Sequence, residues 1–350
     1  GNAEKAKVMI KNLIDNFEDY IDPNDPTNNC LDVAIITAPE KRTQKTIDKL
    51  KTIAGRVLVK WKIFFLKLIM KYLDIIDLDQ RIEIMDIGAA AIAETPIYNK
   101  LIDEKIANLT AFEGDKRQSE KLKSKYGNNI RLYNEFLFDG SFQNLYLAHP
   151  ESGMTSLLKP NEKVLNFFNG FANFGKVEKI EKIKTEKLDS INNLPLIDFA
   201  KLDIQGSELT VLKNGEKKLE NCLAIQLEVS FVCLYEDQPS FGEVDTWMRS
   251  KGYLPHSFLH IKRWSISPTI FNNNFRQPGN QLLESDIIYI KDPFKLDLLS
   301  DIQLKKFILI SHYSFKSVDL SVYLILELEK RNVLTKNTFK NYINNFKKYS

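Results

Sequence analysis

The sequence has few of the residues from which disulfide frameworks and zinc sites are built. Its 350 residues include only 3 cysteines, Cys30, Cys222 and Cys233, which are odd in number and show no Cys-x-x-Cys spacing. Neither a disulfide scaffold nor a structural zinc site is therefore expected, and a reducing, cytoplasmic compartment is favoured. Histidine is also scarce, at 4 residues, and no spacing singles out one of them as a general base.

A concentration of charge of one sign is also missing. The chain has 49 basic and 46 acidic residues, a formal net charge of +3, and its lysines are scattered without an arginine-rich block. This balance is too even to predict a nucleic-acid partner. With 27% charged and 11% aromatic residues, the composition is that of a soluble globular protein with a full core.

No hydrophobic run is long enough to cross a membrane. The most apolar stretch, residues 61–78, is interrupted by five charged residues, Lys62, Lys67, Lys71, Asp74 and Asp77, which excludes a spanning helix. Its apolar positions follow helical spacing and predict a helix that packs on the main domain or on a partner subunit; an interfacial membrane helix is the alternative. No signal peptide is expected, because no apolar core follows Gly1.

The pattern divides the chain into three parts. Residues 1–80 and 295–350 are predicted to be helical extensions, and residues 81–294 alternate between strands and helices. Predicted strands at 82–87, 109–113, 130–133, 199–203 and 223–229 form β–α–β units, which indicate an α/β domain with a parallel sheet covered on both faces. Two late strands, 253–261 and 286–290, have no helix between them and predict an antiparallel pair. Residues 140–182 are expected to hold short strands and a long loop.

Two helix boundaries matter for the position of the site. Thr95 is predicted to cap a helix that has Pro96 at its first position and continues to about Ile106. A second helix is predicted from about Ser207 to Leu219.

Three predicted strands end in a carboxylate, at Asp86, Glu113 and Asp203. In open α/β sheets ligands bind at the carboxyl ends of the strands, so this repetition suggests a site for a nucleotide-type cofactor. Glu113 is suited to accept hydrogen bonds from both hydroxyls of a ribose. A solvated glutamate at a strand end explains its position equally well.

The turn after the first strand, residues 88–91, has one glycine where a dinucleotide fingerprint has three. The following helix also begins late, so a pyrophosphate would not meet its N-terminus. A nicotinamide or flavin enzyme is therefore disfavoured, although small residues after Gly88 still allow a ligand to approach the backbone closely.

Glu228 and His256 are the further candidates for acid–base chemistry. Glu228 ends the strand expected beside that of Asp203, and two neighbouring carboxylates can hold a proton, a substrate hydroxyl or a divalent cation. Too few oxygen ligands are identifiable for a metal site, so no metal is predicted. His256 and His260 are the better candidates among the histidines, while Glu208 is explained by the dipole of the helix it begins.

Several segments together resemble the FkbM-type S-adenosylmethionine-dependent methyltransferase family. Residues 203–208, Asp-Ile-Gln-Gly-Ser-Glu, are similar to the family signature, and residues 85–89 resemble its first motif. Phe112-Glu113 resembles the second motif, with Gly114 in place of the usual proline. Residues 154–158 and 185–190 resemble the family's middle loop and the segment before the signature. The resemblance runs from about residue 81 to 292.

The resemblance implies a class I, Rossmann-like fold with a seven-stranded, mostly parallel sheet and an antiparallel last strand. It implies S-adenosylmethionine as the cofactor and methyl transfer to oxygen, on a sugar of a glycan or glycolipid, or alternatively on a polyketide or other small metabolite. Asp86, Gly88 and Ala89 would hold the methionine end of the cofactor, Glu113 its ribose, and Asp203 would lie beside methionine and acceptor.

The residues leave three points open. Asp203 is the first choice as base or orienting residue, with Glu228 or His256 as the alternative base. Ala91 and Ile92 stand near where the family commonly has another glycine, which predicts a tighter or rearranged pocket. An oxidoreductase with an adenosine cofactor and a non-catalytic partner domain are the competing functions. Homo-oligomers through the helical extensions are the expected assembly.

Overall fold

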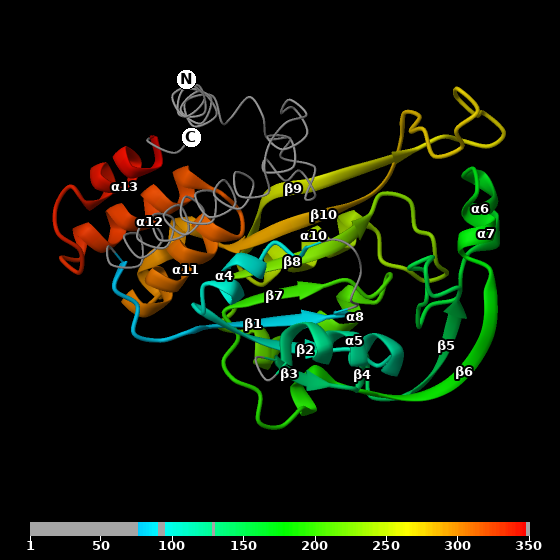
Figure 1. Cartoon of the computed structure of the whole chain (residues 1–350), viewed down its shortest axis with the longest axis horizontal. Helices are drawn as coiled ribbons and strands as arrows, with labels where there is room; N and C mark the ends of the chain where they lie inside the picture. Colours follow the sequence, from blue (N-terminus) through cyan, green and yellow to red (C-terminus); the bar gives the residue numbers. More distant parts are fainter. Residues whose placement is uncertain (1–75, 90–94, 128–129, 348–350) are drawn as a thin grey trace, which may run out of the picture. The chain divides into compact units, whose positions relative to one another are not determined.

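A computed structural model describes residues 76–89, 95–127 and 130–347 (Figure 1). The predicted helices within residues 1–75, together with Cys30, Ala91 and Ile92, lie outside the described residues.

Seven strands form one sheet in the order β3-β2-β1-β7-β8-β10-β9 (Figure 1). Their bounds are β1 Ile82–Ile87, β2 Ala107–Phe112, β3 Ile130–Tyr133, β7 Phe199–Leu202, β8 Ala224–Ser230, β9 Tyr253–Trp264 and β10 Gln281–Lys291. The neighbours from β3 to β8 pair in parallel, whereas β10 is antiparallel to both β8 and β9. This topology confirms the predicted mostly parallel sheet with an antiparallel last strand.

The central strands are nearly continuous apolar runs because helices cover the sheet on both sides. The helices of the domain are α4 Asn99–Asp103, α5 Lys116–Tyr126, α6 Glu162–Phe167, α7 Phe171–Phe174, α8 Glu208–Lys213, α9 Glu216–Leu219 and α10 Phe241–Ser250, with a 3-10 helix η3 Leu188–Ser190. On one face, α8, α9 and α10 pack on the sheet, and Leu212 and Met248 share a buried cluster with Met85, Ala200 and Leu227.

Alternation along the strands directs Asp86, Lys201 and Glu228 to the opposite face. On that face Leu122 of α5 packs against Ala111 of β2. The face therefore combines apolar packing with a row of charged side chains near the carboxyl ends of the strands.

Residues 140–182 are more regular than predicted. A second, three-stranded sheet has the order β4-β6-β5, with bounds β4 Phe136–Leu137, β5 Phe142–Ala148 and β6 Val177–Glu186. β5 and β6 form an antiparallel pair, and the segment that connects them contains α6 and α7, drawn beside the pair in Figure 1. The prediction of short strands was wrong for β6 because its many Lys and Glu residues give little apolar signal for a strand of 10 residues.

Two predicted helix boundaries were also wrong. The helix expected from Thr95 begins only at Asn99, because Pro96 and Tyr98 form a turn in which the Asn99 N–H donates to the Pro96 carbonyl at 2.9 Å. The helix expected over 207–219 is two helices. It breaks at Gly215, and the Asp189 carboxylate accepts the N–H of Lys218 at 3.0 Å at the start of α9.

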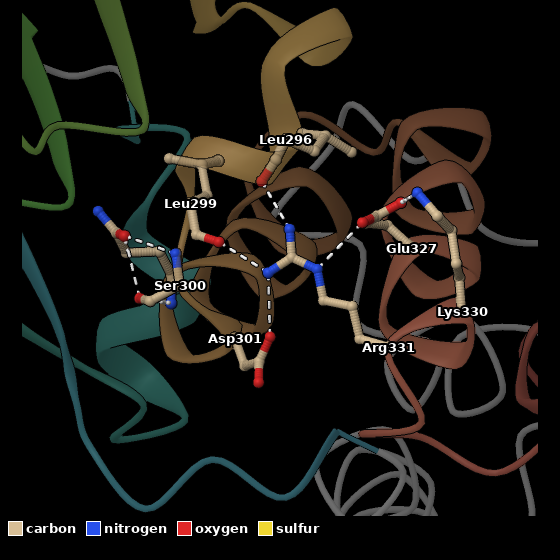
Figure 2. Close-up of polar contacts among 8 residues, drawn as sticks. Leu296, Leu299, Ser300, Asp301, Glu327, Lys330 and Arg331 are labelled. Atoms are coloured by element: carbon tan, nitrogen blue, oxygen red, sulfur yellow. Dashed lines mark hydrogen bonds and ion pairs between the residues drawn. The ribbon is translucent and has the colours of Figure 1, made fainter.

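After β10 the chain is helical, with η4 Pro293–Leu298, α11 Asp301–Tyr313, α12 Val318–Lys330 and α13 Thr338–Lys347. Arg331 links the end of α12 to the start of α11 (Figure 2). Its guanidinium donates hydrogen bonds to the carbonyls of Leu296 and Leu299. It also forms ion pairs with Asp301 and Glu327.

The helix α11 is also fastened to the sheet. Lys306 of α11 forms a buried ion pair of 2.8 Å with Asp198, and the same carboxylate oxygen of Asp198 accepts the N–H of Glu83 on β1 at 2.8 Å. Phe315, between α11 and α12, packs edge-on to Phe199 of β7. Among the described residues, no helix is long and apolar enough to cross a membrane.

Candidate active site

A cleft of about 670 Å³ opens at the carboxyl ends of β1, β2 and β7. Its floor includes Gly88, Glu113 and Asp203, and its opposite wall is the antiparallel β5–β6 pair with residues such as Leu147 and Ile183. The volume lies within the range of about 300–1,000 Å³ that is usual for small-molecule and cofactor sites. Three of the predicted cofactor residues therefore line one cleft.

Gly88 allows the carboxyl ends of β1 and β7 to approach each other closely. It has a φ of +80°, and a Cβ built on it would stand 2.0 Å from the carbonyl oxygen of Asp203. The backbone N–H of Asp203 donates to Ile87 at 3.0 Å, and the Gly88 N–H donates to Phe112 at 3.0 Å. Only glycine fits here, and its first role is to let two strand ends meet at the floor of the cleft.

Glu113 is largely buried at the end of β2 and lines the cleft. Its Oε1 accepts the backbone N–H of Asp115 at 2.7 Å. Burial raises the pKa of its carboxyl to about 7, although the Asp115 hydrogen bond acts in the opposite direction. The group therefore changes charge near neutral pH and can accept hydroxyl donors when it is ionised.

Asp86 lies behind the floor of the cleft rather than in its lining. It accepts a hydrogen bond from the Tyr98 hydroxyl, and its Oδ1 lies 3.9 Å from Lys201 Nζ. Burial raises the pKa of Asp86, whereas Lys201 and Tyr98 lower it. Ala89 is also behind the floor, where its N–H donates to Phe112 at 3.3 Å and its side chain packs with Ala111 and Leu122.

Lys201 connects Asp86 to Asp203. Its Nζ donates to Asp203 Oδ2 at 3.1 Å and is held largely buried between the two carboxylates. Burial by itself would lower the pKa of Lys201, but the charges of Asp86 and Asp203 outweigh it and raise that pKa. The cation stays protonated and fixes the orientation of Asp203.

A single amide joins Asp203 and Glu228. Gln205 Nε2 lies 3.3 Å from Asp203 Oδ1 and donates to Glu228 Oε2 at 3.0 Å. Burial, followed by the nearby Glu284 and Asp203, raises the pKa of Glu228 well above its usual value. Two of the three predicted catalytic residues thus share one hydrogen-bonded network.

The loop that carries Gln205 is tightly held. Gln205 and Gly206 both have left-handed backbones, with φ of 54° and 98°. The Tyr235 hydroxyl donates to Gln205 Oε1 at 3.0 Å, and the Ser156 hydroxyl donates to the Gln205 carbonyl at 2.7 Å. The carboxylate of Glu208 accepts the N–H of Ile204 at 2.9 Å. Glu208 has a structural role here, and the orientation of Gln205 is fixed from three sides.

The structure does not bring His256 into this network. It lies near the start of β9, where its Nε2 is 3.0 Å from the Ser317 hydroxyl, and burial lowers its pKa. His260 lies further along β9, opposite Asp286. Burial, followed by the nearby Asp203, raises the pKa of Asp286.

Sequence reasoning missed Lys201, Tyr98, Gln205 and Tyr235. Lys201 alone had a visible signal, because it is a cation inside the short apolar strand Phe-Ala-Lys-Leu. Gln205 stands inside the 203–208 signature, but its bond to Glu228, 23 residues away, is a tertiary contact. Tyr98 and Tyr235 come from other segments, 12 residues from Asp86 and 30 residues from Gln205. Among the residues that the structure describes, no group of three or more His, Cys, Asp and Glu side chains could hold a metal ion.

The strand order, with an antiparallel strand between β8 and β9, and the cleft at the carboxyl ends of β1, β2 and β7 define a class I, Rossmann-like methyltransferase fold. The model of the Methyltransferase FkbM domain family matches residues 86–255. This chain therefore carries an FkbM methyltransferase domain over those residues, which confirms the resemblance seen in the sequence. Its cofactor is S-adenosylmethionine, and its activity is methyl transfer.

Three of the similar solved structures are described as methyltransferases, and all three are distant in sequence. A Streptococcus pneumoniae protein described as a tRNA (m1A22) methyltransferase, in complex with S-adenosyl-L-methionine, is 12% identical, with 79% of this chain and 98% of that chain covered and a TM-score of 0.31. The precorrin-6y C5,15-methyltransferase of Geobacter metallireducens GS-15 is 13% identical, with 61% and 83% covered and a TM-score of 0.32. The magnesium protoporphyrin IX methyltransferase of Synechocystis PCC 6803 is 9% identical, with 73% and 87% covered and a TM-score of 0.28.

No curated protein matches this chain.

Proposed function

We propose that this domain is an O-methyltransferase that acts on a hydroxyl group of a sugar in a glycan or glycolipid. The proposal rests on the network Lys201–Asp203–Gln205–Glu228, which sets Asp203 at the floor of the cleft. A fixed carboxylate beside the cofactor is suited to orient an acceptor hydroxyl and to take its proton.

Gly88, Glu113 and Asp203 are the residues that we propose to hold the cofactor. The fit is supported by the size of the cleft and by the position of all three residues in its lining. Glu113 accepts the ribose hydroxyls, and Asp86 supports the floor through Lys201. The bound cofactor supplies an electrophilic methyl group on a sulfonium that leaves readily.

The chain's own residues must then align the acceptor and manage its proton. Asp203 is the proposed base, since Lys201 and Gln205 fix both of its oxygens. Glu228 is the alternative base. Because burial raises its pKa, it can accept a proton only in the fraction of molecules in which it is ionised. His256 is the weakest candidate because its ring is engaged by Ser317 and Phe315.

The charge of the cleft supports a neutral acceptor over RNA or another polyanion. Six carboxylates line it, from Glu113, Asp115, Glu135, Glu178, Glu181 and Asp203, against one lysine, Lys179. Lys179 is itself paired with Glu181 at 2.6 Å. A sugar hydroxyl avoids the repulsion that a phosphate backbone would meet here. The unpaired Cys222 and Cys233 thiols support a cytoplasmic location.

Transfer of a radiolabelled methyl group to surface glycans and lipid-linked sugars tests the proposal. Asp203→Asn should reduce turnover by about 10²–10⁴-fold, the usual contribution of a positioned acid or base, while the variant stays folded. If Asp203→Asn leaves transfer unchanged and Glu228→Gln abolishes it, the roles are assigned wrongly. A mass gain of one methylene unit on one sugar, seen in producing but not in deletion strains, would identify the acceptor.

A further inference from the structure

The loop between β9 and β10, together with α6 and α7, forms an exposed apolar surface away from the catalytic network. Five large side chains on it are each 38–53% exposed: Phe167, Ile266, Ile270, Phe271 and Phe275. Figure 1 shows this loop projecting beyond the end of the long β9–β10 pair. We call these two segments, residues 161–175 and 265–280, the tip surface. A cluster of this kind on a soluble domain marks an interaction site.

The two segments of the tip surface are held together by hydrogen bonds and ring packing. The amide of Asn169 donates to the Ser265 hydroxyl at 2.9 Å, and the Ser267 N–H donates to the Phe167 carbonyl at 2.9 Å. The rings of Phe171 and Trp264 meet edge to face at 5.0 Å. The exposed side chains are therefore held in place on a packed base.

Some polar groups at the tip of the loop are paired within the loop. The Asn274 N–H donates to the Phe271 carbonyl at 2.8 Å, and the Asn272 amide donates to Gln277 at 3.0 Å. Such internal hydrogen bonds lower the cost of moving a loop from water into a less polar medium.

The charge around the tip surface is positive on balance. Residues 257–283 contain no Asp or Glu, but they contain Lys262, Arg263 and Arg276. Lys262 is paired with Glu284, and the exposed Glu162 is offset by its neighbour Lys163, so Arg263 and Arg276 supply the excess. Arg263 is exposed, and the Arg276 guanidinium lies 5.5 Å from the centre of the Phe174 ring. Exposed aromatic and aliphatic side chains beside cations are the features that bind anionic membrane interfaces.

We infer that the tip surface docks this protein peripherally on an anionic lipid bilayer. Ile270 and Phe271 enter the interface, and Arg263 and Arg276 contact lipid headgroups. The surface also adjoins the cleft, because Phe168 and Phe171 share a buried cluster with Ala148 and Met154 of the cleft's wall region. Docking would bring a lipid-anchored acceptor near the cleft, but the docking itself does not depend on methyl transfer.

Vesicle co-sedimentation of the full chain tests the inference. The vesicles contain phosphatidylcholine alone or equal parts of phosphatidylcholine and phosphatidylglycerol. We expect binding only to the anionic vesicles, and weaker binding at raised salt. The double variant Ile270→Ser with Phe271→Ser should bind about tenfold more weakly, and Arg263→Gln about fivefold more weakly.

The control replaces two leucines elsewhere that are more exposed than Ile270 and Phe271, Leu196→Ser with Leu298→Ser, which are 72% and 73% exposed. It should bind vesicles like the wild type, and all variants should keep their affinity for S-adenosylhomocysteine, which shows that they fold. The inference is overturned if the wild type does not sediment with anionic vesicles. It is equally overturned if the tip variant binds as the wild type does, or if light scattering shows that the tip variant only converts a dimer to a monomer.

Discussion

Gly88 and Asp203 touch so closely that no side chain fits between them. A Cβ on Gly88 would stand 2.0 Å from the Asp203 carbonyl oxygen, and its φ is +80°. These two residues carry the turn after β1 and the turn after β7, so the contact defines the floor of the cleft.

The Gly88→Ala variant should therefore lose both stability and cofactor binding. The added methyl meets backbone rather than a flexible side chain, so we expect a loss of about 2–4 kcal/mol in the free energy of unfolding. Urea unfolding measures the loss. The control is Gly242→Ala on the exposed start of α10, where the nearest atom to a Cβ is 4.0 Å away and the change should stay within about 1 kcal/mol. Equal stability of the Gly88 variant and the wild type would refute the close contact.

Lys201→Met should be strongly destabilising because Asp86 and Asp203 lose the cation between them. Breaking a buried ion pair from one side costs about 3–5 kcal/mol. Lys251→Met, which removes a surface pair with Glu216, should cost less than about 1 kcal/mol.

The loss at Lys201 should also depend on pH. Burial raises the pKa of Asp86, and removing Lys201 raises it further, so the folded variant holds a proton that the unfolded chain releases above about pH 4. Stability that is present below that pH is then lost as pH rises. Chemical unfolding at several pH values should show the gap between variant and wild type widening from about pH 4 towards pH 7; a constant gap would contradict this account.

Cofactor affinity should rise with pH through the titration of Glu113. Its pKa of about 7 means that the carboxyl is mostly protonated at lower pH and ionised at higher pH. If the ribose binds only the carboxylate, the affinity for S-adenosylhomocysteine increases by about tenfold between about pH 6 and pH 8, following the ionised fraction. Glu113→Gln should bind weakly and without this dependence.

Glu208 provides the matched control for Glu113. Its buried carboxyl also has a pKa of about 7, but it bonds the backbone of Ile204 and Gly206 rather than lining the cleft. Calorimetry on Glu208→Gln should retain the pH dependence of binding. Loss of the dependence in Glu208→Gln, but not in Glu113→Gln, would show that the wrong carboxyl was chosen.

Arg331→Met should loosen the C-terminal helices. Figure 2 shows that one guanidinium serves Leu296, Leu299, Asp301 and Glu327. Two carbonyls lose their donor, so a loss of about 2–4 kcal/mol in the free energy of unfolding is expected. Lys330→Met, whose exposed side chain reaches only Glu327, should cost less than about 1 kcal/mol. Similar losses in both variants would rule out the special role of Arg331.

The sheet could be predicted because β1, β2 and β7 are short, largely apolar runs. Asp86 is the last residue but one of β1, and Glu113 and Asp203 directly follow β2 and β7. The pairing of β5 with β6 could not be predicted, since β6 is rich in Lys and Glu and buries little. The start of α4 was missed because Tyr98 turns towards Asp86, a tertiary contact that overrides the capping signal of Thr95.

The site could be predicted only in part from the sequence, again because tertiary contacts complete it. Strand ends indicated Asp203 and Glu228, but their link through Gln205 depends on the parallel register of β7 and β8. His256 was a candidate by residue type, and its bond to Ser317 depends on where the C-terminal helices pack.

The central claim is that the cleft at the strand ends binds S-adenosylmethionine through Gly88, Glu113 and Asp203. Isothermal titration of the full chain with S-adenosylhomocysteine, compared between the wild type and Glu113→Gln, tests it most directly. We predict saturable binding at one site per chain, weakened about tenfold or more in the variant by the loss of charged hydrogen bonds. No heat of binding in the folded wild type, or equal affinity in both proteins, would contradict it.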